Sequence, residues 1–362
     1  MAAGGTGQEG RVLVVGAARS GLAAARALCR VMPDAPVVLA DRDSEPALAA
    51  EAAQLRELGV GVELGREDNS LLDGCSLVVK SPGVPNGISL LVEARRQGIP
   101  VIGEVEFAWR HLENLMVGVT GTNGKTTTTE LIGHILKESG RRALVAGNVG
   151  TPLSSLVGEV DGDTVLVVEL SSFQLEDTVD FRPDVAVLLN LTEDHLDRHP
   201  DLEHYFSSKM MVFANQGSED VAILNRDDPN SQRPVPGHAR QLWFGRSGRA
   251  APEAGGPEAS VYLREGTICA DADTVGEAAA GLKSRVPWQR AGYQWGDGRK
   301  GPGGGEDSEG GGCRTVIEWS RASLKGDHNL ENALAATAAC LSLGLATGEV
   351  AAGLTGFPGV RH

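Results

Sequence analysis

Hydrophobic positions along the chain form short continuous runs separated by alanine- and leucine-rich stretches. The first runs predict strands at 11–16, 36–41, 76–80 and 99–102, with a helix at 19–31 between the first two. The rhythm then restarts, with strands expected at 115–119, 164–169 and 185–190 and a helix from about Lys125. Continuous apolar strands separated by helices are typical of parallel sheets covered on both faces. Two successive α/β domains are therefore expected.

The predicted domains meet near Gly103, which gives residues 1–102 and residues 103–359, with 360–362 beginning a further domain. Residues 245–314 interrupt the pattern, because they are rich in glycine, proline and charge and include GPGGGEDSEGGG at 301–312. Such a stretch buries too little apolar surface to offset its ordering entropy. We interpret much of it as a disordered surface insertion, and expect order to return with a helix at 329–343.

The net charge of the chain limits which kinds of binding partner are expected. With 33 basic and 48 acidic side chains the net charge is −15, which argues against nucleic acid or an anionic membrane as partner. The first residues show no signal-peptide pattern, and no apolar run approaches the ~20 residues that a membrane span needs. The five cysteines are scattered, as free thiols of a reducing cytoplasm would be.

A first glycine-rich loop, GAARSG at 16–21, follows a predicted strand and precedes a predicted helix. Asp41 ends the following strand, where an acidic residue can meet a ribose hydroxyl. The pattern fits a dinucleotide cofactor, another nucleotide or merely a tight turn. Ser81-Pro82-Gly83 also follows a strand, and is either part of a ligand site or an ordinary loop.

A second glycine-rich loop carries the strongest local signal. In GVTGTNGKTTT (Gly118–Thr128), backbone N–H groups can surround an anion, Lys125 can reach terminal phosphates and Thr126 can hold a magnesium ion. Val119 stands where the strict phosphate-loop pattern has glycine, and a chance glycine turn is the alternative.

Two acidic motifs follow later strands. Glu169 opens ELSSFQLE and suits Mg²⁺, although a helix-capping acid is the alternative. NLTEDHLDRH at 190–199 is either a solvated charged loop or part of an active site at a third strand end. Lys209, taken alone, looks like an ordinary surface lysine.

These motifs, together with GDHNLENALAA at 326–336, occur in the order found in Mur ligases, and the chain resembles that family. ELSSFQLE is most similar to the D-glutamate-adding members. The resemblance implies a Rossmann-like UDP-binding domain followed by a phosphate-loop parallel-sheet ATPase domain. The family pattern continues past His362 with a C-terminal Rossmann-like domain, which we expect to be absent here, so that the chain folds but does not ligate alone.

The resemblance also implies residue roles. The UDP-linked substrate would be bound by Arg19, Ser20, Asp41, Arg42, Ser81, Pro82, Gly83, Asn148, Ser171 and Gln174. ATP would be bound by Gly121, Thr122, Asn123, Gly124, Lys125, Thr126, Thr127, Asn329 and Asn332. The catalytic set would be Lys125, Glu169, His195 and Lys209, with two Mg²⁺ ions held by Thr126, Glu169, His195 and a carbamylated Lys209.

The implied reaction is a cytoplasmic, bacterial step of peptidoglycan precursor synthesis. ATP phosphorylates the carboxylate of UDP-N-acetylmuramoyl-L-alanine, and D-glutamate attacks the acyl phosphate. We expect a monomer acting on small molecules. The alternatives are a sister amide ligase of the folylpolyglutamate or diaminopimelate type, an NAD-dependent dehydrogenase built on GAARSG, and a non-catalytic nucleotide-binding module.

Overall fold

The computed structural model describes residues 10–44, 48–194, 199–249, 256–290 and 312–360, and its chain folds into two compact units. The first unit comprises residues 1–113, 150–160 and 173–181. The second comprises residues 114–149, 161–172 and 182–362.

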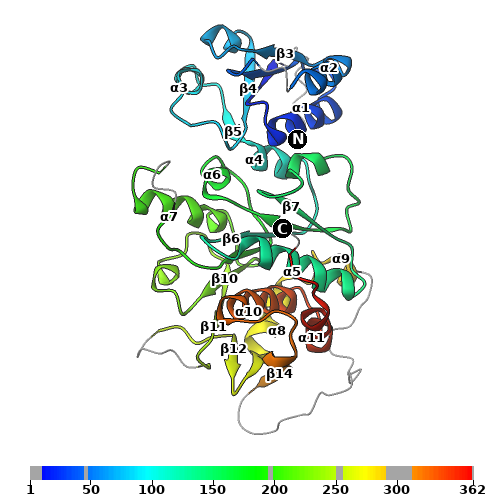
Figure 1. The fold of residues 1–362 in the computed structure, drawn as a ribbon, viewed down its shortest axis with the longest axis vertical. Helices are drawn as coiled ribbons and strands as arrows, with labels where there is room; N and C mark the ends of the chain where they lie inside the picture. The colour runs from blue at the N-terminus through cyan, green and yellow to red at the C-terminus, as the bar shows by residue number, and fades with distance from the viewer. Residues whose placement is uncertain (1–9, 45–47, 195–198, 250–255, 291–311, 361–362) are drawn as a thin grey trace. The chain divides into compact units, whose positions relative to one another are not determined.

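The described part of the first unit contains a parallel five-stranded sheet in the order β3-β2-β1-β4-β5 (Figure 1). Its strands are β1 (Arg11–Val15), β2 (Val37–Asp41), β3 (Gly61–Leu64), β4 (Cys75–Lys80) and β5 (Val101–Gly103). Its helices are α1 (Arg19–Val31), α2 (Ala49–Glu57), η2 (Asn69–Leu72), α3 (Ser89–Arg96), α4 (Glu104–Arg110) and η3 (Leu153–Leu156). Residues 12–15 of β1 are all apolar and buried, as in a central parallel strand. The predicted first domain is therefore confirmed as an α/β fold.

Helix α4 explains why the first unit continues past Gly103, where the sequence places the domain boundary. The Glu104 carboxylate accepts hydrogen bonds from the Ser154 backbone N–H at 2.7 Å and from the Ser154 hydroxyl. The Glu106 carboxylate accepts from the backbone N–H groups of residues 179–181 at 2.9–3.1 Å. Both carboxylates are buried, so they tie two later segments to this helix. A linear reading of the chain cannot show such pairings.

The second unit contains a nine-stranded sheet within its described residues, in the order β14-β13-β12-β11-β10-β9-β6-β8-β7. The strands are β6 (Met116–Thr120), β7 (Ala143–Gly147), β8 (Val165–Glu169), β9 (Val185–Leu188), β10 (Val221–Asn225), β11 (Arg240–Gly245), β12 (Val261–Arg264), β13 (Thr267–Asp271) and β14 (Cys313–Glu318). The strands from β7 to β12 are parallel, and β13 and β14 pair antiparallel. The carboxyl ends of β6, β8, β9, β10 and β11 therefore share one edge.

Helices α5 (Lys125–Glu138), α8 (Ala272–Leu282), α10 (Asp327–Ser342) and α11 (Thr347–Gly356) of the second unit pack against strands of this sheet. The remaining described helices are α6 (Ser172–Leu175), α7 (Leu202–Met210) and α9 (Pro287–Arg290), with short turns η4 (Met211–Phe213), η5 (Pro229–Gln232) and η6 (Trp319–Arg321). Helices α5 and α10 lie side by side (Figure 1). Most of α10 is buried, and its alanines at 333, 335, 336, 338 and 339 permit close approach of neighbouring elements. The helix expected at 329–343 is confirmed.

The interpretation of 245–314 as largely disordered is corrected for residues 256–290. These residues form β12, β13, α8 and α9, and Val261, Ile268 and Leu282 belong to the main hydrophobic core. Short strands of four or five residues bury enough apolar surface only because they extend an existing sheet. The most glycine-rich part, at 301–311, lies outside the described residues.

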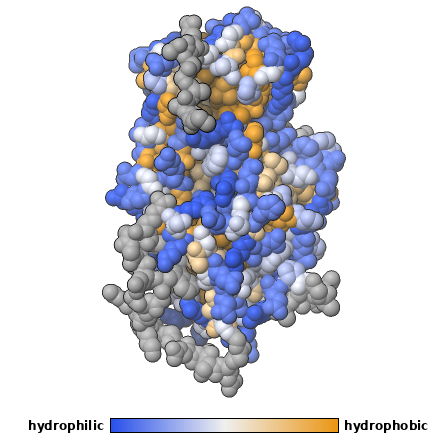
Figure 2. All heavy atoms as spheres, turned by 180° about the vertical axis from the view of Figure 1, so that it is seen from behind, coloured by the Kyte–Doolittle hydropathy of each residue, from blue (hydrophilic) through white to orange (hydrophobic). Residues whose placement is uncertain are grey.

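Hydrophilic residues cover most of the face drawn in Figure 2, with smaller hydrophobic areas between them. Among the described residues, the large hydrophobic side chains that are exposed are scattered through the sequence, at Leu58, Val92, Leu144, Val149 and Val179. Single exposed apolar side chains are ordinary on protein surfaces. No helix within the described residues is long and apolar enough to cross a membrane.

Candidate nucleotide and substrate sites

The phosphate loop connects β6 to α5 at the common carboxyl edge of the second sheet. Gly124 has a φ of 85° and immediately precedes α5, so a residue with a side chain would be strained there. The loop is held by Asn190, whose Oδ1 accepts from the Asn123 backbone N–H at 2.8 Å and whose Nδ2 donates to the Asn123 carbonyl at 3.1 Å. The predicted loop thus forms at the N-terminus of a helix, where backbone N–H groups favour an anion.

Lys125 lies inside this loop. Its Nζ donates to the carbonyls of Gly121 at 3.0 Å and Thr122 at 2.9 Å. Burial lowers the pKa of Lys125 below its ordinary value, while the carboxylates of Glu169 and Asp194 oppose that shift. A partly desolvated cation beside helix N–H groups is suited to the terminal phosphates of a nucleotide.

Glu169 ends β8, the strand next to β6, and is 3% exposed. Its Oε2 accepts from the Thr126 hydroxyl at 2.8 Å, and its Oε1 accepts from Asn148 Nδ2 at 3.0 Å. A carboxylate and a hydroxyl that meet at one point beside the phosphate loop form an oxygen donor set of the kind that Mg²⁺ takes together with phosphates. The residues present therefore fit that ion.

Lys209 is buried, not at the surface as its sequence context alone indicates. Lys209 is 2% exposed, its Nζ donates to the Gly121 carbonyl at 2.8 Å and the same atom lies 4.7 Å from the centre of the Tyr205 ring. Burial and the nearby charge of Lys125 lower the pKa of Lys209 to about 7, against the opposing effect of Asp194. A substantial fraction of this amine is therefore neutral near physiological pH.

The loop at 190–199 also reaches the phosphate loop. Thr122 Oγ1 accepts from the Thr192 backbone N–H at 3.0 Å and lies 3.1 Å from the Tyr205 hydroxyl. His195 lies outside the described residues, so its predicted role stays a prediction. His199, the last residue of NLTEDHLDRH, is buried with its Nε2 2.9 Å from the Ser172 hydroxyl.

Asn329 and Asn332 lie on the first turns of α10. A Cβ atom on Gly124 would collide with Asn332 Oδ1, so this amide stands directly against the phosphate loop. Asn332 Nδ2 is 3.4 Å from Asn329 Oδ1, which places the two amides together. The structure thus brings Asn329 and Asn332 to the phosphate loop from a position some 200 residues later in the chain.

The two loops predicted for the UDP substrate meet in the first unit. A Cβ atom on Gly16, whose φ is 99°, would lie 2.8 Å from Ser81 Cβ, and one on Gly21 would collide with the Gly16 carbonyl. Asp41 accepts from the backbone N–H groups of Ala17 at 2.6 Å and Asp43 at 2.9 Å. Asp41 therefore also has a structural role, which the ribose interpretation did not include.

The remaining predicted substrate residues are divided between the units. Arg19, Ser20, Arg42, Pro82, Gly83 and Gln174 belong to the first unit, and Asn148 and Ser171 to the second. Sequence reasoning missed Lys80, which is 2% exposed and donates its Nζ to the Val84 carbonyl at 2.7 Å, inside the loop that follows Ser81. Its place at the end of an apolar strand was the available signal.

Comparison with known proteins identifies the family. Residues 10–103 match the "Mur ligase MurD-like, N-terminal domain" and residues 119–263 the "Mur ligase middle domain". A UDP-N-acetylmuramoylalanine–D-glutamate ligase of Alkaliphilus oremlandii is 38% identical over 98% of this chain and 69% of its own length. The chain belongs to the Mur ligase family.

Other Mur ligases extend this comparison. The enzyme of the same name from Pelotomaculum thermopropionicum is 40% identical over 97% of this chain and 68% of its own length. The fold of this Mur ligase also resembles that of a solved UDP-N-acetylmuramate:L-alanyl-gamma-D-glutamyl-meso-diaminopimelate ligase from Neisseria meningitides, with a TM-score of 0.57 and 17% identity over 98% of this chain and 99% of that one. At that identity the similarity concerns the fold alone.

Proposed function

We propose that this Mur ligase acts in the ATP-dependent addition of D-glutamate to UDP-N-acetylmuramoyl-L-alanine, a cytoplasmic step of peptidoglycan precursor synthesis on small molecules. The observation that carries the proposal is the meeting of Lys125, Glu169 and Lys209 at one loop on the sheet edge. The name shared by relatives at 38% and 40% identity gives the specific reaction. We further propose that the protein works as a monomer.

The phosphate loop would bind ATP. The N–H groups at the start of α5 and the Lys125 ammonium would balance the charge of the transferring phosphoryl group, which is the main catalytic requirement of such a transfer. Thr126 and Glu169 would hold Mg²⁺, which supplies further neutralisation of phosphate charge when bound. Asn329 and Asn332 would lie at the nucleoside end, because their neutral amides can both donate to and accept from a base.

Lys209 would hold a second ion as a carbamate, together with His195. The neutral amine attacks the carbon of carbon dioxide, a new N–C bond forms, and one proton leaves to solvent. The product is an anionic oxygen ligand in place of an ammonium. The lowered pKa of Lys209 supports this proposal, because only the neutral amine reacts.

The first unit would bind the UDP end of the substrate. The helix α1 begins immediately after the loop at 16–18, and a diphosphate is suited to helix N–H groups. Arg19 and Arg42 supply cations near this loop, and Ser81-Pro82-Gly83 lies against it through Gly16.

Calorimetric titration of the purified chain tests the proposal. UDP-N-acetylmuramoyl-L-alanine is expected to bind more tightly than the corresponding dipeptide substrate of a diaminopimelate-adding ligase, and NAD is expected not to bind. A non-hydrolysable ATP analogue is expected to bind only with Mg²⁺. Preference for the dipeptide substrate would indicate a sister ligase, and binding of NAD in place of the UDP compound would overturn the proposed function.

A further inference from the structure

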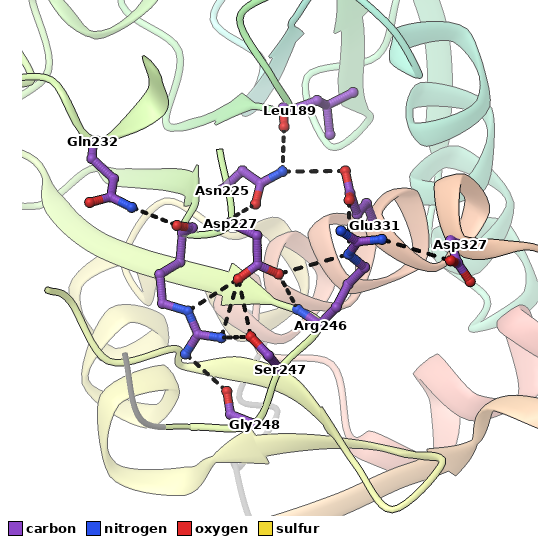
Figure 3. Close-up of polar contacts among 10 residues, drawn as sticks. Leu189, Asn225, Asp227, Gln232, Arg246, Ser247, Gly248, Asp327 and Glu331 are labelled. Carbon is purple, nitrogen blue, oxygen red and sulfur yellow. Dashed lines mark hydrogen bonds and ion pairs between the residues drawn. The ribbon is translucent and has the colours of Figure 1, made fainter. Parts of the chain in front are cut away.

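A polar network connects the ends of three strands with the first turns of α10 (Figure 3). Asn225, the last residue of β10, is 2% exposed. Its Nδ2 donates to the Leu189 carbonyl at 2.8 Å and lies 3.4 Å from Glu331 Oε2 on α10. Its Oδ1 accepts from the Asp227 backbone N–H at 2.9 Å. One amide thus contacts the segment after β9, the turn after β10 and a helix more than 100 residues later.

Arg246, directly after β11, contacts the same helix. Its Nε is 3.1 Å from Glu331 Oε1, and its Nη1 is 3.9 Å from Asp327 Oδ2. Its backbone N–H donates to Asp227 Oδ2 at 2.5 Å (Figure 3). The two acids are one helical turn apart, so the guanidinium reaches both from a backbone position that is itself fixed.

Glu331 is the residue on which these contacts converge. Each of its carboxylate oxygens has a different partner, Asn225 for Oε2 and Arg246 for Oε1. Burial raises the pKa of Glu331 above its ordinary value, although Arg246 and His328 act in the opposite direction. The cost of burying this carboxylate is thus offset only in part, which makes its geometry sensitive to the loss of either partner.

On the first turns of α10, the two acidic residues of this network and the two asparagines lie on different faces of the helix. Asp327 and Glu331 face the ends of β10 and β11, whereas Asn332 stands against Gly124 of the phosphate loop. The Leu189 carbonyl, which Asn225 binds, directly precedes Asn190, the residue that holds the phosphate loop. The network therefore holds the first turns of α10 beside the phosphate loop.

We propose that Glu331 is a positioning residue that sets where Asn329 and Asn332 stand at the nucleoside end of the nucleotide site. This inference rests on the proposed binding of ATP at the phosphate loop. Glu331 acts through α10 and does not itself touch the phosphates, which belong to the loop and Lys125. Its removal therefore weakens recognition of the nucleoside and spares recognition of the phosphate chain.

The test compares two ligands, a magnesium complex of a non-hydrolysable ATP analogue and magnesium tripolyphosphate, by calorimetry. Glu331→Gln keeps the shape of the side chain and removes its charge. It is expected to weaken nucleotide binding about tenfold, the loss of roughly one charge-assisted hydrogen bond, with tripolyphosphate affinity unchanged within about twofold. Glu138→Gln, at an exposed position of α5, is the matched control and is expected to change neither.

Arg246→Met provides a second variant. It removes the contacts of a half-exposed guanidinium with Asp327 and Glu331 and keeps the backbone hydrogen bond to Asp227. It is expected to show the same selective loss, with a thermal midpoint close to that of wild type. Equal losses for both ligands, or no loss for either, would overturn this inference alone. Wild-type protein that binds neither ligand would overturn the proposed function and this inference with it.

Discussion

The Nζ of Lys80 lies 2.7 Å from Oδ2 of Asp177, and both side chains are almost completely buried. Asp177 is further fixed by Asn86 Nδ2, which donates to its Oδ1 at 2.9 Å, and by its own carbonyl, which accepts from the Gly103 backbone N–H. Burial raises the pKa of Asp177 despite the nearby ammonium. The pair thus connects the loop after Ser81 with the segment that follows Gln174, at a considerable desolvation cost.

Lys80→Met should destabilise the protein strongly, because it leaves the Asp177 carboxylate buried without its cation. We expect the free energy of unfolding to fall by about 3–5 kcal/mol in urea titrations. The loss should grow as pH rises above the ordinary pKa of aspartate, because the folded state must then keep Asp177 protonated. Lys80→Met with Asp177→Leu should recover most of it.

The control for this experiment is Arg96→Met, which breaks an exposed ion pair with Glu93. A change of about 0–1 kcal/mol is expected there. A Lys80→Met protein as stable as the Arg96→Met protein would show that the buried pair contributes nothing to the fold.

Lys125→Ala should weaken binding of the magnesium complex of an ATP analogue. The variant loses a partly desolvated cation against phosphate, which we expect to cost about 2–3 kcal/mol in binding free energy. Lys137→Ala, an exposed lysine of the same helix, should leave the affinity unchanged in the same calorimetric titration. Indistinguishable affinities for the two variants would remove Lys125 from the site.

Lys209 should take up carbon dioxide. In ¹³C NMR with labelled bicarbonate, a carbamate signal is expected above about pH 7 and should decline below it, because the ammonium form does not react. Lys209→Met should abolish the signal, whereas Lys283→Met, at an exposed position, should retain it. A signal that survives in the Lys209→Met protein would assign the carbamate elsewhere.

Lys209 should also make stability depend on pH. Its pKa is lowered from 10.5 to about 7 in the folded state, so between these values the unfolded chain binds more protons. The free energy of unfolding should therefore rise with pH across this window, by at most about 1.4 kcal/mol per pH unit from this residue. In carbonate-free buffer, Lys209→Met should lack this slope and Lys137→Met should keep it. Parallel curves for all three proteins would contradict the burial of a charged amine.

Local patterns predicted the parts of the fold that local chemistry determines. The helix at 19–31 matches α1 because its apolar positions repeat with a helical period and a glycine-rich loop precedes it. Strands β12 and β13 were missed because four or five residues in a glycine-rich region carry too little periodic signal, and an existing sheet edge stabilises them. These two strands form because they pair with neighbouring strands, which their own composition does not reveal.

Local sequence patterns likewise predicted only part of the candidate site. The phosphate loop and Glu169 could be predicted to lie together from residue type and position at strand ends, and the structure does bring Thr126 and Glu169 into contact. The burial of Lys209 was not predicted, because it depends on Tyr205 and on the Gly121 carbonyl, which no local pattern connects to it. The buried position of Lys80 was not predicted for a similar reason, because its partner Asp177 lies in another part of the chain.

The contacts of α4 bear on any attempt to study the first unit as a separate fragment. A gene fragment ending at residue 102 would express strands β1 to β4 and a shortened β5, without Glu104, Glu106 or the segments at 150–160 and 173–181 that they hold. It would also remove the Asp177 carboxylate that pairs with the buried Lys80 ammonium. Aggregation or rapid degradation of such a fragment would then reflect the missing peptide segments rather than an unstable substrate domain. Ligand-binding measurements on the substrate end therefore require the uncut chain, with single substitutions in place of truncations.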